Sequence, residues 1–484
     1  MKLNKLLILI LIFVLAFRLF FVFQTENYSS DDSYFHLLYI NNIFENKQPM
    51  LYDELSYGGR SVVYTPLFHY IMAVFSFIPG FLKILPATFI SILVLISYLI
   101  SKEIYDNKII NISIASLSGF IPIIFDQTLN QISPLSLLLP LSLLMLYSLM
   151  KIDKNKNYTI LFIITALLMP FIHPASFIIL LSVLLFLILA NTESIKINPV
   201  KQEAVLFFSI FTLLVSFIIY KKAILLYGFD ILRQNIPIAI LNNYFSTLNL
   251  FESIFKIGLL SFVLGIIGIF YGCFKEKREH IILLSSLVLS VTALLLLKLI
   301  NLKIGLMLLG IGLTLISTLT LAKLYKYLDI TKFAKYKRFF FPALMILIVI
   351  SAIIPSYFAA KDVIKKAPTN QELQELNSFR DLPFKTSILG SLEEGHLINY
   401  ASGKKSIIDG NFLLAPKPTQ RFIDVNIIYT TPFVTTSVDL LHQYKVKYIY
   451  LSDRTKELYD INTLKIAEDE TCFTKVNNFY EVIC

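Results

Sequence analysis

Two neighbouring carboxylates and a histidine stand where the first apolar segment of the chain ends. Asp31 and Asp32 follow that segment by a few residues, and His36 comes four positions after Asp32. Residues four apart share one face of a helix, and the stretch SYFHLLYINNIF is typical of a helix. A carboxylate there can take a proton as a general base, or hold Mg²⁺ or Mn²⁺ against a phosphate. The alternative is a helix start capped by Ser29, Ser30 or either acid, and both interpretations hold if one acid caps while its neighbour reacts.

Further polar and aromatic groups follow closely in the chain. The stretch YDELSYGGR carries a Gly-Gly pair directly before Arg60, which predicts a tight turn, and an arginine at such a turn suits an anionic group. Tyr64 and His69 come next, in the stretch YTPLFH. Solvated loop charges are the alternative. We expect Arg60, Tyr64 and His69 to bind the substrate on which the carboxylates act.

Long apolar runs must hold these residues in place. The chain has 484 residues, 56% of them hydrophobic and 16% charged, and runs of about 20 apolar residues recur from Leu6 to Phe358. The first run lacks a small-residue cleavage site, so we interpret it as a retained helix and not as a signal peptide. The sequence predicts a polytopic α-helical membrane protein of about eleven spans, at residues 6–24, 84–101, 109–125, 134–150, 158–172, 175–190, 203–220, 252–273, 281–297, 304–322 and 339–358.

The charges predict the topology of these spans. The net charge of +10 divides into +11 for residues 1–358 and −1 for residues 359–484. The strongest basic clusters, KIDKNKN, KEKRE and KLYKYLDITKFAKYKR, all fall on one side of the predicted membrane, which is the cytoplasmic side by the positive-inside rule. The positive excess therefore sets topology, and we expect no nucleic-acid partner. We predict a multi-pass protein of the cell membrane with a cytoplasmic N-terminus and an extracytoplasmic C-terminal domain.

One apolar stretch does not fit the count of spans. Residues 62–80 carry Pro66, His69 and Pro79, and a full crossing there would place KIDKNKN outside. We therefore interpret the stretch as an interfacial or re-entrant helix within a long first outer loop, residues 25–83. The predicted transmembrane domain is then residues 1–358, with this loop included.

The composition changes after Phe358. A connector and an amphipathic helix (KDVIKKAPTNQELQELNSF) precede short strand-like runs, TSILGSL, KSIIDG and VKYIYLS, which alternate with helical ones. This pattern predicts a small α/β domain over residues 359–484. Cys472 and Cys484 flank a final pair of strand-like runs, and on the outer side they predict a disulfide, with two unpaired thiols as the alternative.

The first outer loop resembles a known group of enzymes. DDSYFHLLYI, a Gly-rich segment and then YTPLFHYIMA resemble the beginning of GT-C membrane glycosyltransferases. DSYFH resembles the D-P-W-F-N stretch of the oligosaccharyltransferase catalytic subunit. YTPLFHYI resembles the H-P-P-L-Y-Y-L stretch of the dolichyl-phosphate-mannose protein mannosyltransferases and their bacterial relatives. The resemblance implies a GT-C fold with a small exterior α/β domain.

The same resemblance implies roles for the acids. In both groups an acidic residue of the first outer loop is catalytic, and the match carries this role onto Asp32 and, next to it, Asp31. The donor would be a polyprenyl- or dolichyl-phosphate-linked sugar, whose lipid tail stays in the membrane, and the acceptor would be protein, lipid or glycan. Oligosaccharyltransferases carry another acidic motif in the second outer loop. Here it is Asp126 or it is missing, so Asp32 and Asp126 are the candidate ligands for Mg²⁺ or Mn²⁺; a helix terminus is the alternative for Asp126.

The exterior domain extends the similarity, with a difference. SLEEGHLINYASGKKSIIDGNF resembles the W-W-D-Y-G segment of oligosaccharyltransferases and the run after it, which lie at the acceptor peptide in that family. The two tryptophans and the tyrosine are absent, so a peptide-sequon role is not carried over. We expect Glu394 and His396 of this segment to contact the substrate, with a strand–loop–helix and a capping acid as the alternative. Arg233, in the outer loop 221–251, is expected at the donor phosphate unless it is a solvated loop arginine.

The predicted function is transfer of a sugar from a polyprenyl-phosphate carrier to an acceptor on the outer face. A transporter or flippase for a lipid-linked or anionic substrate is one alternative, and a catalytically inactive scaffold of the same fold is another. Transporters usually keep ionisable residues near the middle of the membrane, within broken helices. In the predicted spans such residues are scarce and gather at the outer ends, which favours the enzyme.

Overall fold

The computed structural model describes residues 5–241, 249–332 and 334–484 of the chain. By its internal contacts the chain divides into two compact units. The first comprises residues 1–25, 65–219 and 244–365, and the second comprises residues 26–64, 220–243 and 366–484. The sequence-based division into 1–358 and 359–484 stays a prediction, whereas the contacts group residues 26–64 and 220–243 with the C-terminal residues.

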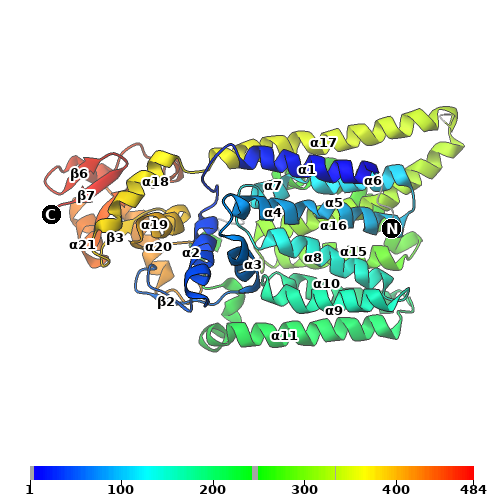
Figure 1. Ribbon diagram of the computed structural model, residues 1–484, viewed down its shortest axis with the longest axis horizontal. Helices are drawn as coiled ribbons and strands as arrows, with labels where there is room; N and C mark the ends of the chain where they lie inside the picture. Colours follow the sequence, from blue (N-terminus) through cyan, green and yellow to red (C-terminus); the bar gives the residue numbers. More distant parts are fainter. Residues whose placement is uncertain (1–4, 242–248, 333) are drawn as a thin grey trace. The chain divides into compact units, whose positions relative to one another are not determined.

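The first unit consists of helices rich in Leu, Ile, Val and Phe, drawn side by side in Figure 1. Within each helix the backbone N–H and C=O groups bond to one another, as the hydrocarbon layer of a membrane requires. The helices are α1 (Lys5–Val22), α3 (Leu67–Phe75), α4 (Phe81–Ser91), α5 (Leu93–Ile104), α6 (Lys108–Gly119), α7 (Pro122–Thr128), α8 (Leu135–Lys151), α9 (Lys156–Leu168), α10 (Ser176–Thr192), α11 (Pro199–Tyr227, in this unit up to Ile219), α13 (Leu250–Ile257), α14 (Leu259–Ile269) continued by a π-helical turn (Phe270–Lys275), α15 (Glu279–Leu296), α16 (Leu302–Tyr327) and α17 (Lys337–Lys365).

Helix α16 is the centre of this unit. It packs against α5, α6, α14 and α15, and almost all of its apolar stretch is buried. Gly265 and Gly268 of α14 allow the closest approach, because a Cβ added to either would lie within 2.8 Å of a backbone oxygen of α16, that of Leu313 or Ile316. Small residues serve the same purpose in many membrane helix pairs, where tight packing replaces the hydrophobic effect.

The chain spans a membrane, with helices at all of the predicted spans. Among the described residues, seven helices are long and apolar enough to cross, and an eighth is obtained if the bent pair α13 and α14 counts as one span. Three shorter apolar helices, Leu135–Lys151, Lys156–Phe171 and Ser176–Thr192, lie at three further predicted spans. The count of about eleven stays a prediction, because these three fall below the usual crossing length.

The apolar stretch 62–80 forms only a short helix. Helix α3 has 9 residues, Leu67–Phe75, and begins directly after Pro66. At about 1.5 Å per residue it is far shorter than the roughly 30 Å hydrocarbon layer. It is therefore not a full span, in agreement with the prediction that this stretch does not cross the membrane.

The second unit is built around a five-stranded sheet. The strand order is β4-β3-β5-β7-β6, with β3 parallel to β4 and β5, and β7 antiparallel to β5 and β6. The strand-like runs of the sequence and the final pair of strands are all found here. The strands are β3 (Ser387–Leu389), β4 (Lys405–Ser406), β5 (Val446–Tyr450), β6 (Phe473–Val476) and β7 (Phe479–Val482). The helices are α2 (Asp31–Asn46), α18 (Asn370–Asn377), α19 (Gly395–Ser402), α20 (Pro418–Thr430), α21 (Val434–Gln443) and α22 (Asp453–Tyr459).

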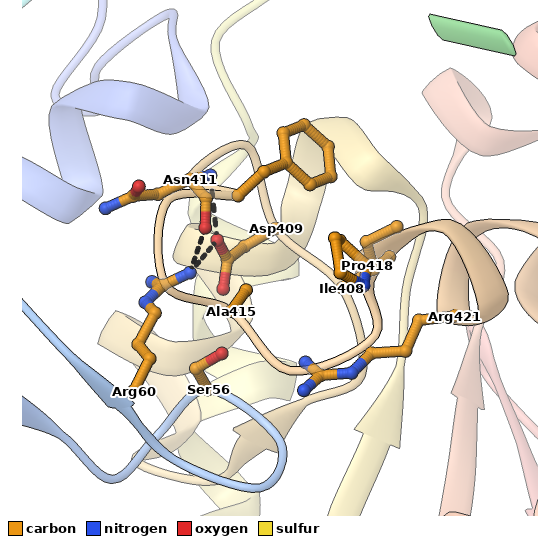
Figure 2. Close-up of a pocket in the computed structure, with 9 residues that line it drawn as sticks. Ser56, Arg60, Ile408, Asp409, Asn411, Ala415, Pro418 and Arg421 are labelled. Carbon is orange, nitrogen blue, oxygen red and sulfur yellow. Dashed lines mark hydrogen bonds and ion pairs between the residues drawn. The ribbon is translucent and has the colours of Figure 1, made fainter. Parts of the chain in front are cut away.

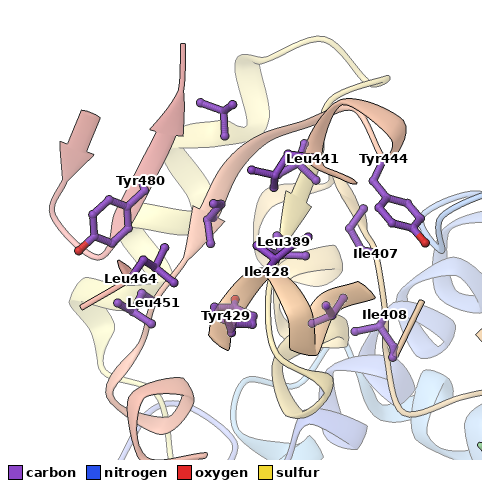
Figure 3. Close-up of a cluster of buried hydrophobic side chains, with 14 of the residues drawn as sticks. Leu389, Ile407, Ile408, Ile428, Tyr429, Leu441, Tyr444, Leu451, Leu464 and Tyr480 are labelled. Carbon is purple, nitrogen blue, oxygen red and sulfur yellow. The ribbon is translucent and has the colours of Figure 1, made fainter. Parts of the chain in front are cut away.

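An apolar core holds helices onto this sheet. Figure 3 shows Leu389 of β3 among side chains of α20 and α21, such as Ile428 and Leu441. Tyr429 is fully buried in the core, where its hydroxyl donates to the Tyr450 backbone oxygen at 2.8 Å, so its polar atom is satisfied. The predicted disulfide forms: Cys472 and Cys484 are bonded, closing the β6–β7 hairpin.

The first outer loop contributes a hairpin to this unit. Strands β1 (Tyr52–Asp53) and β2 (Arg60–Ser61) pair antiparallel. The Gly-Gly turn between them forms as predicted, with φ of 75° at Gly58 and 67° at Gly59. A Cβ at Gly59 would clash with the Tyr52 ring, so the turn needs glycine there. The hairpin loop also pairs with the sheet edge, where the Tyr57 N–H donates to the Ser406 oxygen at 3.1 Å.

Short 3₁₀ segments complete the description. They are Met169–Phe171, Gly228–Arg233, Leu328–Ile330, Ala334–Tyr336, Ser378–Asp381, Leu392–Glu394 and Lys465–Glu468.

Candidate active site

The first carboxylate of the pair, Asp31, binds the N-terminus of another helix. Its Oδ1 accepts the Leu397 N–H at 2.8 Å, and its Oδ2 accepts the His396 N–H at 3.1 Å. These are amides of the first turn of α19, which have no partner within their own helix, and the helix dipole favours a negative charge there. Asp31 lies in the first turn of α2 but caps α19, so it fixes one helix to the other. The N-cap of α2 is Ser30, whose side chain makes no capping bond.

Loss of solvation raises the pKa of Asp31 to about 7, although the nearby His396 ring and the two amides favour the ionised form. A carboxylate with this pKa is partly ionised at neutral pH. Its role in the structure is to accept two hydrogen bonds, and both of its oxygens are occupied in doing so.

The second carboxylate, Asp32, is exposed and has no hydrogen-bond or ion-pair partner among the described residues. It is the next residue of the same helix turn, so the Asp31 clamp also fixes its position. The two neighbouring acids therefore lie in different environments. Both oxygens of Asp31 accept hydrogen bonds within the protein, whereas the carboxylate of Asp32 is available to a ligand. Asp31 is thus an acid that caps a helix, and the reactive role that the resemblance implies for Asp32 stays a prediction.

Gly410 keeps the space beside Asp32 open. A Cβ at this position would lie 3.5 Å from Asp32 Oδ1 and 4.0 Å from His396 Nε2. The carboxylate of α2 and the imidazole of α19 thus face the same point in space, and the residue there is exposed and has no side chain. Asp409 and Gly410 were not predicted as site residues; the only signal was an Asp-Gly pair after the strand-like run KSII.

His396 is buried against a second carboxylate and an aromatic ring. Its Nε2 lies 3.6 Å from Asp409 Oδ1, and its ring centroid lies 5.0 Å from that of Phe35. Burial opposes ionisation of Asp409, but Arg60 and His396 outweigh it and hold the pKa of Asp409 below its usual value. Asp409 is therefore charged at neutral pH and orients the imidazole that stands beside Asp32.

Arg60 joins the hairpin to the loop after β4. Figure 2 shows its guanidinium at Asp409, to which it donates at 2.6 Å, while Asp53 accepts from it at 2.8 Å. The Asn411 backbone oxygen is a further acceptor. All three charged side chains are buried. Burial lowers the pKa of Arg60, but the two carboxylates outweigh it and raise the value above that of free arginine. The predicted contact of Arg60 with a substrate anion stays a prediction; this pairing gives Arg60 a structural role.

Glu394 is fully buried, one residue before α19. It accepts hydrogen bonds from three hydroxyls, those of Ser391, Ser452 and Thr455. Arg454 Nη2 lies 3.4 Å from it. Burial lowers the pKa of Arg454, but nearby groups raise it by more, and Glu394 is the strongest of them. The pKa of Arg454 therefore lies above its usual value. This carboxylate is enclosed by its own domain, so its predicted contact with a substrate would require the network to open.

Three other predicted residues of the second unit lie at different depths. Tyr64 is half-buried and stacks edge-to-face on Tyr39, with ring centroids 4.7 Å apart. His36 lies one turn after Asp32 on α2, with its ring against Phe35. Arg233 is exposed at the end of a 3₁₀ turn and makes no ion pair with a described residue. The substrate contacts of Tyr64 and Arg233 stay predictions, and so does the catalytic role of His36 in support of Asp32.

Two predicted residues belong to the first unit. His69 is buried in α3, and burial lowers the pKa of His69 to about 3, so its imidazole is neutral at pH 7. Asp126 is half-buried in α7, where its Oδ2 accepts from the Gln127 amide at 2.6 Å. Their roles at the substrate and at a metal stay predictions.

The side chains provide only part of a metal site. Among the described residues no group of three His, Cys, Asp or Glu side chains is placed to hold a metal ion. In the second unit Asp32 is free to act as one ligand, whereas both oxygens of Asp31 accept amides. Asp32 is the ligand that the second unit would offer to Mg²⁺ or Mn²⁺, which also take water and substrate phosphates as ligands, and we derive no step through a metal.

Comparison with known proteins finds no family model and no curated protein that matches the chain. Solved structures match over nearly all of it. The archaeal oligosaccharyltransferase AglB from Archaeoglobus fulgidus, in complex with an inhibitory peptide and a dolichol-phosphate, is 14% identical with a TM-score of 0.65, over 99% of this chain and 74% of that chain. An Archaeoglobus fulgidus oligosaccharyltransferase complex with Zn and sulfate is 16% identical with a TM-score of 0.61, over 91% and 67%.

ArnT from Cupriavidus metallidurans, bound to undecaprenyl phosphate, is 8% identical with a TM-score of 0.55, over 97% of both chains. At these identities the likeness shows the fold. The chain has the GT-C fold, as the resemblance of its first outer loop implies.

Glu394 and its neighbour Glu393 allow a test of the buried network. Glu394→Ala would leave Arg454 and three hydroxyls without their acceptor and should lower the free energy of unfolding by about 3 kcal/mol. Glu393→Ala is the matched control, because Glu393 is exposed. Thermal unfolding of the purified protein should show a clear drop in Tm for Glu394→Ala and almost none for Glu393→Ala. Equal Tm values for the two variants would contradict a structural role for Glu394.

Proposed function

We propose that this chain is a membrane glycosyltransferase that moves a sugar from a polyprenyl-phosphate-linked donor to an acceptor. The observation that carries the proposal is Asp32: an exposed carboxylate without a partner, held at a fixed place by the clamp of Asp31, beside a buried imidazole and a residue with no side chain. The fold it shares with AglB and ArnT supports the proposal, since those proteins were solved with dolichol-phosphate and undecaprenyl phosphate.

In the proposed reaction Asp32 is the general base. Its carboxylate takes the proton from a hydroxyl or amide of the acceptor, and the acceptor atom forms a bond to the anomeric carbon of the sugar. The bond from that carbon to the phosphate oxygen breaks, and its electron pair leaves with the polyprenyl phosphate. Asp32 afterwards gives the proton to solvent, so atoms and charge balance.

His396 and Asp409 would shape the site around this base. The buried imidazole lies next to the acceptor position, and the charged Asp409 fixes its orientation. For the negative charge on the leaving phosphate we propose Arg233, an exposed cation that makes no ion pair with a described residue. Arg60 is the weaker candidate because two carboxylates already neutralise it.

We further propose that the N-terminus is cytoplasmic and that the sheet domain is extracytoplasmic. The basic loops support this orientation through the positive-inside rule. The Cys472–Cys484 disulfide gives independent support, because disulfides persist outside the reducing cytoplasm. The reaction would then take place on the outer face, where the head group of a lipid-linked donor lies at the membrane surface.

Replacement of the two acids tests the proposed roles. Asp32→Asn keeps the size of the side chain but removes the base, so kcat for transfer from a labelled polyprenyl-phosphate sugar should fall about 10²- to 10⁴-fold, with the Tm unchanged. Asp31→Asn weakens the cap, which should lower stability by about 1 kcal/mol and reduce kcat far less. Full activity of Asp32→Asn would contradict the assignment, and so would a larger loss of kcat in Asp31→Asn.

Chelation distinguishes the two roles that the carboxylate of Asp32 can have, general base and metal ligand. The base mechanism predicts that the same transfer assay, run after treatment with EDTA and removal of the chelator, keeps its rate, and that Mg²⁺ or Mn²⁺ adds nothing. A rate that is lost on chelation and restored by either ion would contradict the base mechanism and make Asp32 a metal ligand. The Tm of the treated protein is the control for unfolding.

A further inference from the structure

A hollow in the second unit lies along helix α2 and shares His396 with the candidate site. Its volume is about 310 Å³, and aromatic rings of Phe35, Tyr39, Tyr52 and Phe384 line it. This volume is at the lower end of the range for pockets that bind small ligands. The proposed mechanism assigns no ligand to it.

Two independent links join the hollow to the reacting carboxylate. Phe35 lies three residues after Asp32 and Tyr39 seven residues after it, which places all three on one face of α2. His396 also lines the hollow, and its Nε2 lies 4.0 Å from the open point at Gly410 that Asp32 faces at 3.5 Å. Both the α2 face and His396 therefore connect the hollow to the Asp32 carboxylate.

The charges of the lining restrict the ligand. Asp53 shares Arg60 with Asp409, so these three side chains together carry two negative charges and one positive charge. Glu54 is exposed and makes no hydrogen bond or ion pair with a described residue, which leaves it as the acceptor for a ligand. The described lining holds neither lysine nor arginine, and Lys405 lies over one of its rings, with Nζ 5.3 Å from the Phe384 centroid. The carboxylates of Glu54, Asp53 and Asp409 outnumber the cations of Lys405 and Arg60, so a phosphate or carboxylate group is disfavoured.

We propose that this hollow binds a sugar ring without an anionic group, the terminal residue of a glycan acceptor, and presents its hydroxyl to Asp32. The apolar C–H face of a pyranose packs on aromatic rings, and its hydroxyls donate to carboxylates such as Glu54. The compact shape favours a ring over an extended peptide. The inference rests on the proposed function, because it makes the bound sugar the acceptor of that reaction.

Binding can be measured without donor and without turnover. The full-length protein in lipid nanodiscs is studied by saturation-transfer NMR with methyl glycosides of mannose, glucose and galactose, with methyl glucuronide as the anionic probe and an uncharged pentapeptide as the peptide probe. At least one neutral glycoside should receive saturation, while the glucuronide and the pentapeptide should not. Binding of the pentapeptide or the glucuronide at the hollow, or of no glycoside, would overturn the proposal.

Matched variants locate the binding. Phe384→Ala and Glu54→Gln should each weaken glycoside binding about tenfold, the loss of one ring contact or one charged hydrogen bond. The controls are Phe433→Ala, which removes another exposed ring directly before α21, and Glu457→Gln on α22; both should bind as the wild type does. Equal binding by Phe384→Ala and Phe433→Ala would overturn the assignment to the hollow.

Asp32→Asn separates this inference from the proposed function. Asp32 does not line the hollow, so this variant should still bind the glycoside, while its rate of sugar transfer to the glycoside should fall about 10²- to 10⁴-fold. Glycoside binding at the hollow in a wild type that transfers from no donor would remove the proposed function and leave the binding site. Transfer to glycans that is unaffected by Phe384→Ala and Glu54→Gln would remove the binding site and leave the proposed function.

Discussion

The carboxylate of Asp31 accepting two amides of α19 is the interaction on which the site depends. The chain separation between the partners is 365 and 366 residues, so one side chain joins the start of the sequence to its C-terminal domain. Helix starts leave amides without partners and carry a partial positive charge, which makes a carboxylate a strong partner for them. Once α19 is fixed to α2, His396 and the open space at Gly410 stand beside Asp32.

A second constraint holds the same parts from the other side. The buried Arg60 pairs with Asp53 of the hairpin and with Asp409, which lies next to Gly410. A buried charge in such a group is costly without its partners, so the hairpin and the loop can occupy few other arrangements. The acidic and basic residues that look most reactive in the sequence are thus mostly used to build the domain. Asp32 is distinguished from them by having no partner among the described residues.

The sequence predicts the local features of this fold well. Apolar runs mark the helices of the membrane, the strand-like runs become β3, β4 and β5, and the predicted disulfide closes the final pair of strands. The long-range features are not readable in the same way. Glu394 looks like a ligand-binding acid, but its three hydroxyl partners include Ser452 and Thr455, about 60 residues away in the chain. The buried ion pair of Asp409 with Arg60 and the role of Gly410 likewise follow from packing that no local pattern encodes.

Hydrogen exchange of α19 tests the central claim most directly, because it reports on the clamp without requiring a substrate. Peptides that cover residues 395–402 are compared in the wild type, Asp31→Ala and Asp32→Ala. The clamp predicts clearly faster exchange of the first-turn amides, those of His396 and Leu397, in Asp31→Ala alone, with Asp32→Ala like the wild type. Unchanged exchange in Asp31→Ala, or the same increase in both variants, would contradict it.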